Sequence, residues 1–510
     1  MEKVIPRSRW FNPHAFNRKE HATIIIIAST AAQSVFAIEV IAVQRLFYDA
    51  APNALISILI ILSSQLVAFG FAGLLRRALV HPTKMVWPSL LPMTTLLDTL
   101  HRDQRETAKR LRLFYGVFAA IFIWELFPEY VMPVLTGVSV FCLAKRDSLL
   151  FTHLFGGSTG NEGLGILSLG FDWQFITSEP LWFPLETLAN YLIGYVICIC
   201  LFIVVYYGNV WRAQDFPFLS QLLFSDQSNT TNLIQYNHTA ILDHNIVRPD
   251  ALEKQGTPYF SATYAIYLLM NNLAITATIT HLLLWNWDDM KKGYSFLSPR
   301  NLFSCRSQRS QSKNSSEKED LHYQKMRVYK ACPNWWYLAV LVLAIAAGAM
   351  CVGAANSTLP WYSFIISVAL SGALLLFFGA QTALTGFEGN VQPVVQMLGG
   401  FLQPGRPLAN MYFTLFGFNS VVQGITLVQD LKFGQYAKIP PRITFAAQIL
   451  GTMIGSVFTY IIMAQITENQ RDTLLSVQGT NVWSGQSIQQ FNTQVSLPLR
   501  RPHQLVNPPL

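Results

Sequence analysis

Several acidic and amide side chains interrupt apolar stretches of the sequence, where such residues are unusual. Glu39 lies in the run Phe36–Val43. Gln44 and Arg45 follow it about a turn later, and Asp430 closes a later apolar stretch. A charged side chain inside a bilayer is costly unless it is paired or hydrated. These residues therefore indicate a relay for protons or substrate, or else polar contacts that are satisfied within the protein.

Other acids allow a simpler interpretation. Glu125 and Glu129 are four residues apart and share one face of a predicted helix. Glu186 and Glu388 lie at or near the starts of apolar segments, where the helix dipole alone favours an acid. For Glu186 that explanation is preferred. The residues predicted for a substrate or proton pathway are Glu39, Gln44, Arg45, Glu125, Glu388 and Asp430.

The composition predicts that helices in a bilayer position these residues. Apolar residues make up 51% of the 510 positions and charged residues only 13%, whereas soluble domains carry about a quarter charged residues. Spanning a bilayer takes about 20 mostly apolar residues. The predicted fold is an all-α polytopic transmembrane bundle of about 9–11 crossings with broken or re-entrant helices. Its candidate spans are residues 22–43, 53–75, 112–143, 182–207, 260–285, 336–355, 361–384 and 443–466.

Pro and Gly interrupt the shorter apolar stretches, which predicts half-helices or tilted spans at 86–100, 391–402 and 411–429. A Gly-rich stretch at 155–165 lacks the lysine of a phosphate-binding loop, so a mouth or re-entrant segment is predicted there. Non-helical backbone beside membrane spans lines a cavity or packs inside protein. The same interpretation applies to the breaks around Gly386, Gly389, Gly399–Gly400 and Pro404–Pro407.

The segment 112–143 is too long for one straight span, and Pro128 and Pro133 interrupt it. Basic residues precede it, and Lys145 and Arg146 follow it. If both ends are cytoplasmic, the segment is a tight hairpin, which is the preferred prediction. The alternative is a single crossing followed by a re-entrant stretch.

Charge places the two large loops on opposite sides of the membrane. The most basic loop is predicted to be cytoplasmic, with a disordered centre at Ser304–Lys318. The loop with sequons at Asn229 and Asn237 is predicted to be extracytoplasmic. The predicted organisation is a polar segment with an Asn-Pro motif at 1–21, an N-terminal membrane bundle at 22–210, the extracytoplasmic loop at 211–258, a helix at 259–285, the basic loop at 286–334, a C-terminal bundle at 335–468 and a polar tail at 469–510.

Motifs of enzymes are missing from the sequence. It contains no His-Glu-x-x-His and no Walker lysine. We therefore expect no enzyme activity, cofactor or metal site. Transport is expected to be driven by an ion gradient, of protons, and not by ATP. The net charge of +8 resides in loops between apolar runs, which argues against nucleic acid as a partner.

Three motifs carry a resemblance to a known family. Lys438-Ile-Pro-Pro-Arg442 is the most specific, and Pro404-Gly-Arg-Pro-Leu-Ala-Asn410 and Asn12-Pro-His-Ala-Phe-Asn-Arg-Lys-Glu-His21 accompany it. With Glu319-Asp-Leu-His322, they resemble the oligopeptide transporter family of fungi and plants, from about Asn12 to Gln494. The motif positions are Asn12, Pro13, Lys19, Glu20, His21, Gly405, Arg406, Pro407, Asn410, Lys438, Ile439, Pro440, Pro441 and Arg442.

The resemblance implies an all-helical proton symporter in the plasma membrane that brings in short peptides, of about four or five residues, or glutathione. The expected partners are the peptide, protons and the lipid bilayer. A peptide zwitterion needs a cation for its carboxylate and an acid for its ammonium. Candidate cations are Arg45, Lys438 and Arg442, and candidate acids are Glu39, Glu388 and Asp430. For Lys438–Arg442 a rigid basic turn is preferred over direct substrate contact.

The sequence also departs from the family. His14-Ala15 stands where Gly-Pro is usual, Gly386 where Asn is common, and Glu129 where Gly is usual. Helices that the family has before the first motif and after Gln494 are not found, which suggests a fragmentary gene product or a degenerate paralogue. The alternatives are a transporter of metal chelates and a membrane protein without transport activity.

Overall fold

The computed structural model describes residues 16–33, 35–48, 50–101, 104–145, 147–157, 162–173, 175–228, 232–237, 239–243, 246–288, 291, 320–476, 483 and 485–496, without the side chains of 35, 104–107, 239 and 493–496. These residues form an all-α bundle whose one named sheet is a small hairpin of β1 (Leu242–Asp243) and β2 (Ile246–Val247). Within the described ranges, nine helical segments are long and apolar enough to cross a membrane. The predicted all-α polytopic fold is therefore confirmed.

The spanning segments are α1 (Arg18–Ala32) with α2 (Val35–Phe47), α3 (Ala54–Leu79), α5 (Gln104–Trp124), α8 (Leu185–Tyr207), α10 (Ala262–Trp285), α14 (Asn334–Ala354), α15 (Trp361–Thr385), α17 (Pro407–Thr414) with α18 (Ser420–Ala437), and α19 (Pro441–Asn469). The shorter helices are α4 (Leu90–His101), α6 (Val140–Ala144), α7 (Leu149–Phe155), α9 (Pro249–Gln255), α13 (Leu321–Met326), α16 (Gln392–Leu402), α20 (Arg471–Leu475) and α21 (Gln486–Ser496).

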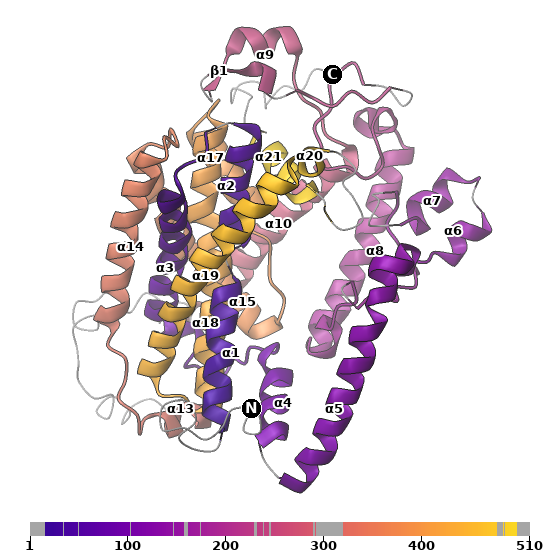
Figure 1. Ribbon diagram of the computed structural model, residues 1–510. Helices are drawn as coiled ribbons and strands as arrows, with labels where there is room; N and C mark the ends of the chain where they lie inside the picture. The colour runs from indigo at the N-terminus through magenta and orange to yellow at the C-terminus, as the bar shows by residue number, and fades with distance from the viewer. Residues whose placement is uncertain are drawn as a thin grey trace.

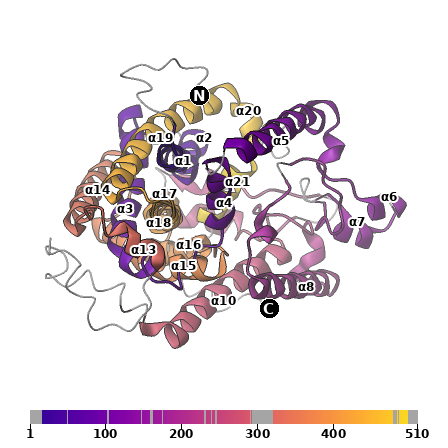
Figure 2. The ribbon, with the colours of Figure 1, turned by 90° about the horizontal axis from the view of Figure 1, so that it is seen from below.

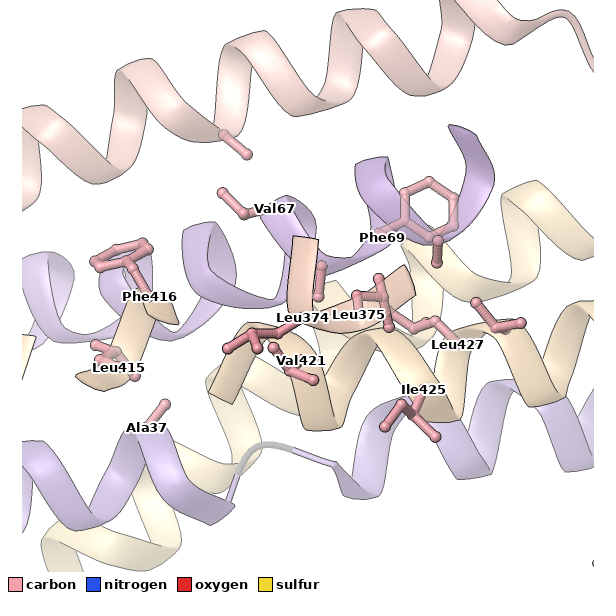
Figure 3. Close-up of a cluster of buried hydrophobic side chains, with 14 of the residues drawn as sticks. Ala37, Val67, Phe69, Leu374, Leu375, Leu415, Phe416, Val421, Ile425 and Leu427 are labelled. Atoms are coloured by element: carbon pink, nitrogen blue, oxygen red, sulfur yellow. The ribbon is translucent and has the colours of Figure 1, made fainter. Parts of the chain in front are cut away.

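The most buried span runs through the centre of the bundle. A π-helical turn at Leu415–Asn419 joins α17 to α18, so the stretch predicted to be broken at 411–429 is part of one continuous span. Of its most apolar window, 83% is buried. Figure 2 shows α17 and α18 inside a ring that includes α1, α3, α15 and α19. Close to it, apolar side chains of α3, α15 and α18 meet, among them Phe69, Leu375 and Ile425 (Figure 3).

The crossing of α3 and α14 is the most extensive helix packing outside the central span. A Cβ on Gly73 would collide with the ring of Tyr337, and a Cβ on Gly70 would lie 2.6 Å from the Cβ of Leu341. The two glycines therefore let the α14 side chains approach the α3 backbone. Tyr337 is only 1% exposed at this crossing.

At the periphery, α5 and α8 pack little (Figure 1), with 6% of each span's window buried. The predicted hairpin at 112–143 is wrong, and the structure is closer to the alternative of one crossing. Beyond α5 and a π-helical turn at Phe127–Val131, the chain forms only a short 3-10 turn and α6. The second helix of a hairpin does not form because the backbone groups of Leu135 and Val138 are hydrogen-bonded to Phe171 and Leu169.

The described parts of the two large loop regions lie at opposite ends of the bundle. The segment with α9 and β1 covers one end, and α13 lies at the other end with α4 and the start of α1 (Figure 1). We call the end with α13 the basic end. Its cytoplasmic location stays a prediction from the positive-inside rule. Asn229 and the predicted disordered segment Ser304–Lys318 lie outside the described residues.

Candidate functional site

A short segment after the basic loop is held against the central span by hydrogen bonds and an ion pair. We call Asp320 and α13 the latch. Asp320 accepts hydrogen bonds from the His322 backbone N–H (2.9 Å), Lys432 Nζ (3.1 Å) and Gln435 Nε2 (2.8 Å). Lys432 is only 1% exposed and also donates to the carbonyl oxygen of Val80. The latch thus compensates a buried cation of α18.

The motif Lys438–Arg442 forms the turn between α18 and α19. Lys438 ends α18 in the left-handed region (φ 60°), Ile439 is buried, and α19 begins at Pro441. Lys438 Nζ lies 2.6 Å from His322 Nδ1 of the latch. The Arg442 guanidinium lies 5.5 Å from the ring centre of Trp336. These contacts, with the two prolines, are those of a rigid basic turn.

The ionisable groups of the latch influence each other. Burial favours the neutral form of Asp320, but the His322 N–H and Lys432 outweigh it and hold the pKa of Asp320 below its usual value. Burial and the neighbouring Lys438 lower the pKa of His322. Burial, with Lys325 adding to it, lowers the pKa of Lys438 to about 8.

Lowering the pH is expected to loosen the latch. Because the pKa of His322 is lower when the latch is docked, the docked state binds fewer protons, and docking weakens as the pH falls below the usual His value of about 6.5. The lowered pKa of Lys438 acts in the same sense at higher pH, so docking strengthens as the pH rises above about 8. Hydrogen exchange of the α13 amides, corrected for the intrinsic rate, measures this.

The matched control is His322→Gln, which still accepts a hydrogen bond from Lys438 but does not titrate. This variant is expected to lose the acidic part of the pH dependence. Equal pH dependence in the two proteins would contradict the role of His322.

Asp430 lies inside the bundle, 6% exposed. Thr30 Oγ1 of α1 donates to its Oδ2 (3.1 Å), and the side chains of Ser29 and Gln448 are also hydrogen-bonded to it. Gln65 of α3 donates to the carbonyl oxygen of Thr30. The carboxyl group therefore lies among neutral polar groups from three helices.

The predicted residues of α2 lie elsewhere. Gln44 is fully buried and accepts a hydrogen bond from the Tyr412 hydroxyl (2.8 Å). Arg45 donates to Thr467 Oγ1 (3.3 Å) near the end of α19 that is remote from the basic turn. Glu39 is half-buried on the same helix. The structure therefore does not bring Arg45 close to Asp430.

A non-helical segment enters the bundle between α15 and α16. Gly386 ends α15 with φ 78°, a left-handed conformation that glycine adopts freely. Asn390 then accepts a hydrogen bond from Asn271 Nδ2 (2.8 Å), nine residues into the 24-residue α10. The segment 386–391 therefore reaches the mid-depth of a spanning helix. Its Glu388 is exposed and accepts a hydrogen bond from Gln429 Nε2 (3.2 Å).

Buried amide groups at both ends of α16 lack partners. Gln381 Oε1, next to Gly389, Gln396 Nε2 and both polar atoms of Gln403 are buried without a hydrogen bond among the described residues. Gln403 ends α16 at the second break, where Gly405 (φ 74°) accepts a hydrogen bond from Val247 N of β2. The breaks predicted at Gly386–Gly389 and before Pro407 are thus non-helical and have unsatisfied polar groups beside them. The break predicted at Gly399–Gly400 is wrong, because both glycines lie within α16.

The remaining motif residues support local structure. Asn17 and Glu20 form a capping box at the start of α1, Lys19 donates to the Tyr329 hydroxyl, and His21 contacts His101. Arg406 precedes Pro407 at the start of α17. On α16, Gly399 leaves room for Asn410. Asn12 and Pro13 lie outside the described residues.

Glu125 and Glu129 lie on peripheral elements. Glu125 follows α5 and accepts a hydrogen bond from the Trp173 N–H (2.9 Å), and Glu129 is half-buried in the π-helical turn. Neither contacts the central span through a hydrogen bond between described residues.

Lys432 and the amides Gln381, Gln396 and Gln403 were missed by reasoning from the sequence. A lysine two residues after Asp430 in an otherwise uncharged helix is a sign that was available. Nothing in the sequence separates the unsatisfied amides from the many satisfied ones.

A bundle with this many spans, a non-helical segment at mid-depth and buried polar groups has the architecture of a polytopic membrane transporter. The chain matches, over residues 1–507, a family described as OPT oligopeptide transporter protein, and it belongs to that family. It is 32% identical to Oligopeptide transporter 7 and 31% identical to Oligopeptide transporter 6, both of Arabidopsis thaliana, over 90% of this chain. It is 30% identical, over 88% of this chain, to Glutathione transporter 1 of Schizosaccharomyces pombe. The chain spans 58%, 62% and 52% of the length of these relatives, respectively.

Proposed function

We propose that the chain takes up short peptides, of about four or five residues, or glutathione, and that protons moving inward across the plasma membrane drive the uptake. The observation that carries the proposal is the non-helical segment 386–391, which enters a bundle of this family at mid-depth. Secondary transporters bind their substrates near the midplane, at discontinuous helices.

The chemistry of this region suits a peptide. A peptide backbone offers both N–H donors and C=O acceptors, and amide side chains complement both. The unsatisfied groups of Gln381, Gln396 and Gln403 supply such donors and acceptors around α16. Glu388 is the acid of this segment and supplies a negative charge for the peptide ammonium. We assign the other predicted pathway residues no contact with the peptide, although Asp430 directly follows Gln429, which donates to Glu388.

Glu388→Gln is expected to raise the KM for a tetrapeptide with a free N-terminus about tenfold or more, with kcat less affected. The reason is the loss of a charge-assisted hydrogen bond, which contributes about 1.5–3 kcal/mol. An N-acetylated peptide of the same sequence should be insensitive to the change. Uptake of the free and the acetylated labelled peptide into proteoliposomes with an acidic outside gives the two KM values. Repeating the uptake with a proton uncoupler tests proton coupling.

The control variant is Glu253→Gln on α9, an exposed acid remote from this segment. Equal effects of Glu388→Gln on free and acetylated peptides would exclude the contact with the ammonium. Uptake of an iron(III) chelate in place of peptides and glutathione would overturn the proposed substrate class. Peptide accumulation that survives the uncoupler would overturn proton coupling.

A further inference from the structure

Asp430 is the only acidic residue on the central span, Pro407–Ala437. It lies seven residues before the end of α18, about 10 Å along the helix from the basic turn. It faces α1 and α19, which pack against α18 (Figure 2). A carboxyl group in such a place is either neutral or matched by a cation.

No cation matches it within the described part of the chain. Lys432, two residues further along α18, pairs with Asp320 instead. Among the other elements packed on α18, α15 has no charged residue. The charged and titratable groups of α1, α3, α4, α13 and α19 that the structure describes form no ion pair with Asp430. Their contacts are with other residues: Arg18 with Asp98, Lys19 with Tyr329, Glu20 with Asn17, His21 with His101, Arg76 with Asn334, His322 with Lys438 and Arg442 with Trp336.

A neighbouring acceptor lacks its donor. Gln448 of α19 is fully buried and hydrogen-bonded to Asp430, and its Nε2 donates to the carbonyl oxygen of Leu427. Its Oε1 is buried without a hydrogen bond among the described residues. A proton on the Asp430 carboxyl would remove the unmatched charge and would add an O–H donor to this group of polar side chains.

We infer that the Asp430 carboxyl, with Thr30 and Gln448, is the site that takes up and releases the coupling proton. The step forms one O–H bond on the carboxylate and breaks the same bond on release, and it needs no other reactant. The inference rests on the proposed function, which it deepens by naming the residue that carries the proton. Lys432 on the same helix differs from Asp430, because it is charged and has Asp320 as its counter-ion.

The test uses Asp430→Asn in the full chain. Asn is uncharged, carries an N–H₂ donor and keeps an acceptor for Thr30, so it imitates the protonated acid. We expect the variant to fold and to exchange internal for external peptide, but to lose accumulation against a gradient and peptide-driven acidification inside proteoliposomes. Glu468→Gln, an exposed acid on α19, is the control and should keep all of these activities.

A second readout does not depend on transport. The infrared difference spectrum of the purified protein between acidic and alkaline buffer should contain a C=O band of a buried carboxylic acid. Asp430→Asn should lack this band, and Glu468→Gln should retain it.

The outcomes are distinct. Proton-driven accumulation by Asp430→Asn, or an unchanged infrared band, would overturn the inference and leave peptide transport in place. A wild-type chain that shows the Asp430 band and moves no peptide would overturn the proposed function, and with it the coupling role. Accumulation driven by sodium in place of protons would also overturn the inference.

Discussion

Replacing Asp320 with Ala is expected to destabilise the protein by about 3–5 kcal/mol, because it leaves a buried cation without its counter-ion. Lys432 is 1% exposed, and the Val80 carbonyl and the Tyr436 ring would be its remaining partners. Removing the cation instead, in Lys432→Met, should cost less, since Asp320 is nearer the surface (12% exposed) and keeps its bonds from His322 and Gln435.

The double variant Asp320→Ala, Lys432→Met separates pairing from packing. Replacing a whole buried ion pair by apolar groups is often nearly neutral, so the double variant should recover most of the loss. The unfolding midpoints of the wild-type protein, the two single variants and the double variant together give the coupling energy between Asp320 and Lys432. Asp226→Ala, which removes an exposed partner of Arg212, is the matched control and should cost less than about 1 kcal/mol. Additive effects of the two latch substitutions would contradict the ion pair.

Gly73→Ala is expected to cost about 3 kcal/mol, at the upper end of overpacking effects. The added Cβ would occupy the place of the Tyr337 ring, and this ring is enclosed between α3, α14 and Phe445 of α19. The ring cannot move into solvent, so the two helices would have to separate. The yield of folded protein and its unfolding midpoint measure the effect.

Glycines in open surroundings provide the control. Gly116 of α5 and Gly194 of α8 have no atom within 4 Å of an added Cβ. Alanine favours helices over glycine by about 0.5–1 kcal/mol, so Gly116→Ala and Gly194→Ala should be neutral or stabilising. A similar loss in all three variants would show that the packing of α3 on α14 is not the cause.

The sequence was sufficient for features that depend on local composition. The spans were predictable because a bilayer demands long apolar runs, and the breaks at Gly386 and Pro404–Pro407 because these residues end helices. The path of residues 112–143, wrongly predicted as a hairpin, was not predictable, because the backbone pairing of Val138 with Leu169 decides it.

The surroundings of the candidate site depend on contacts between distant parts of the chain. Thr30 is 400 residues from Asp430, and Asp320 is 112 residues from Lys432. A sequence shows that each charge lies in an apolar helix, but not which one receives a counter-ion. The presence of a counter-ion is what distinguishes Lys432, which has a structural role, from Asp430, to which we assign the proton.

The π-helical turn at Leu415–Asn419 has a consequence for how α18 is oriented. A regular helix turns by about 100° per residue, and a π turn holds about one residue more. All residues after Asn419 are thus rotated by about one residue's angle from the positions that an unbroken helix would give them. Asp430 and Lys432 point to different neighbours, and this one turn sets both directions. Tightening it to an ordinary α turn would swing both charged groups away from their partners together, while the helix axis stayed in place.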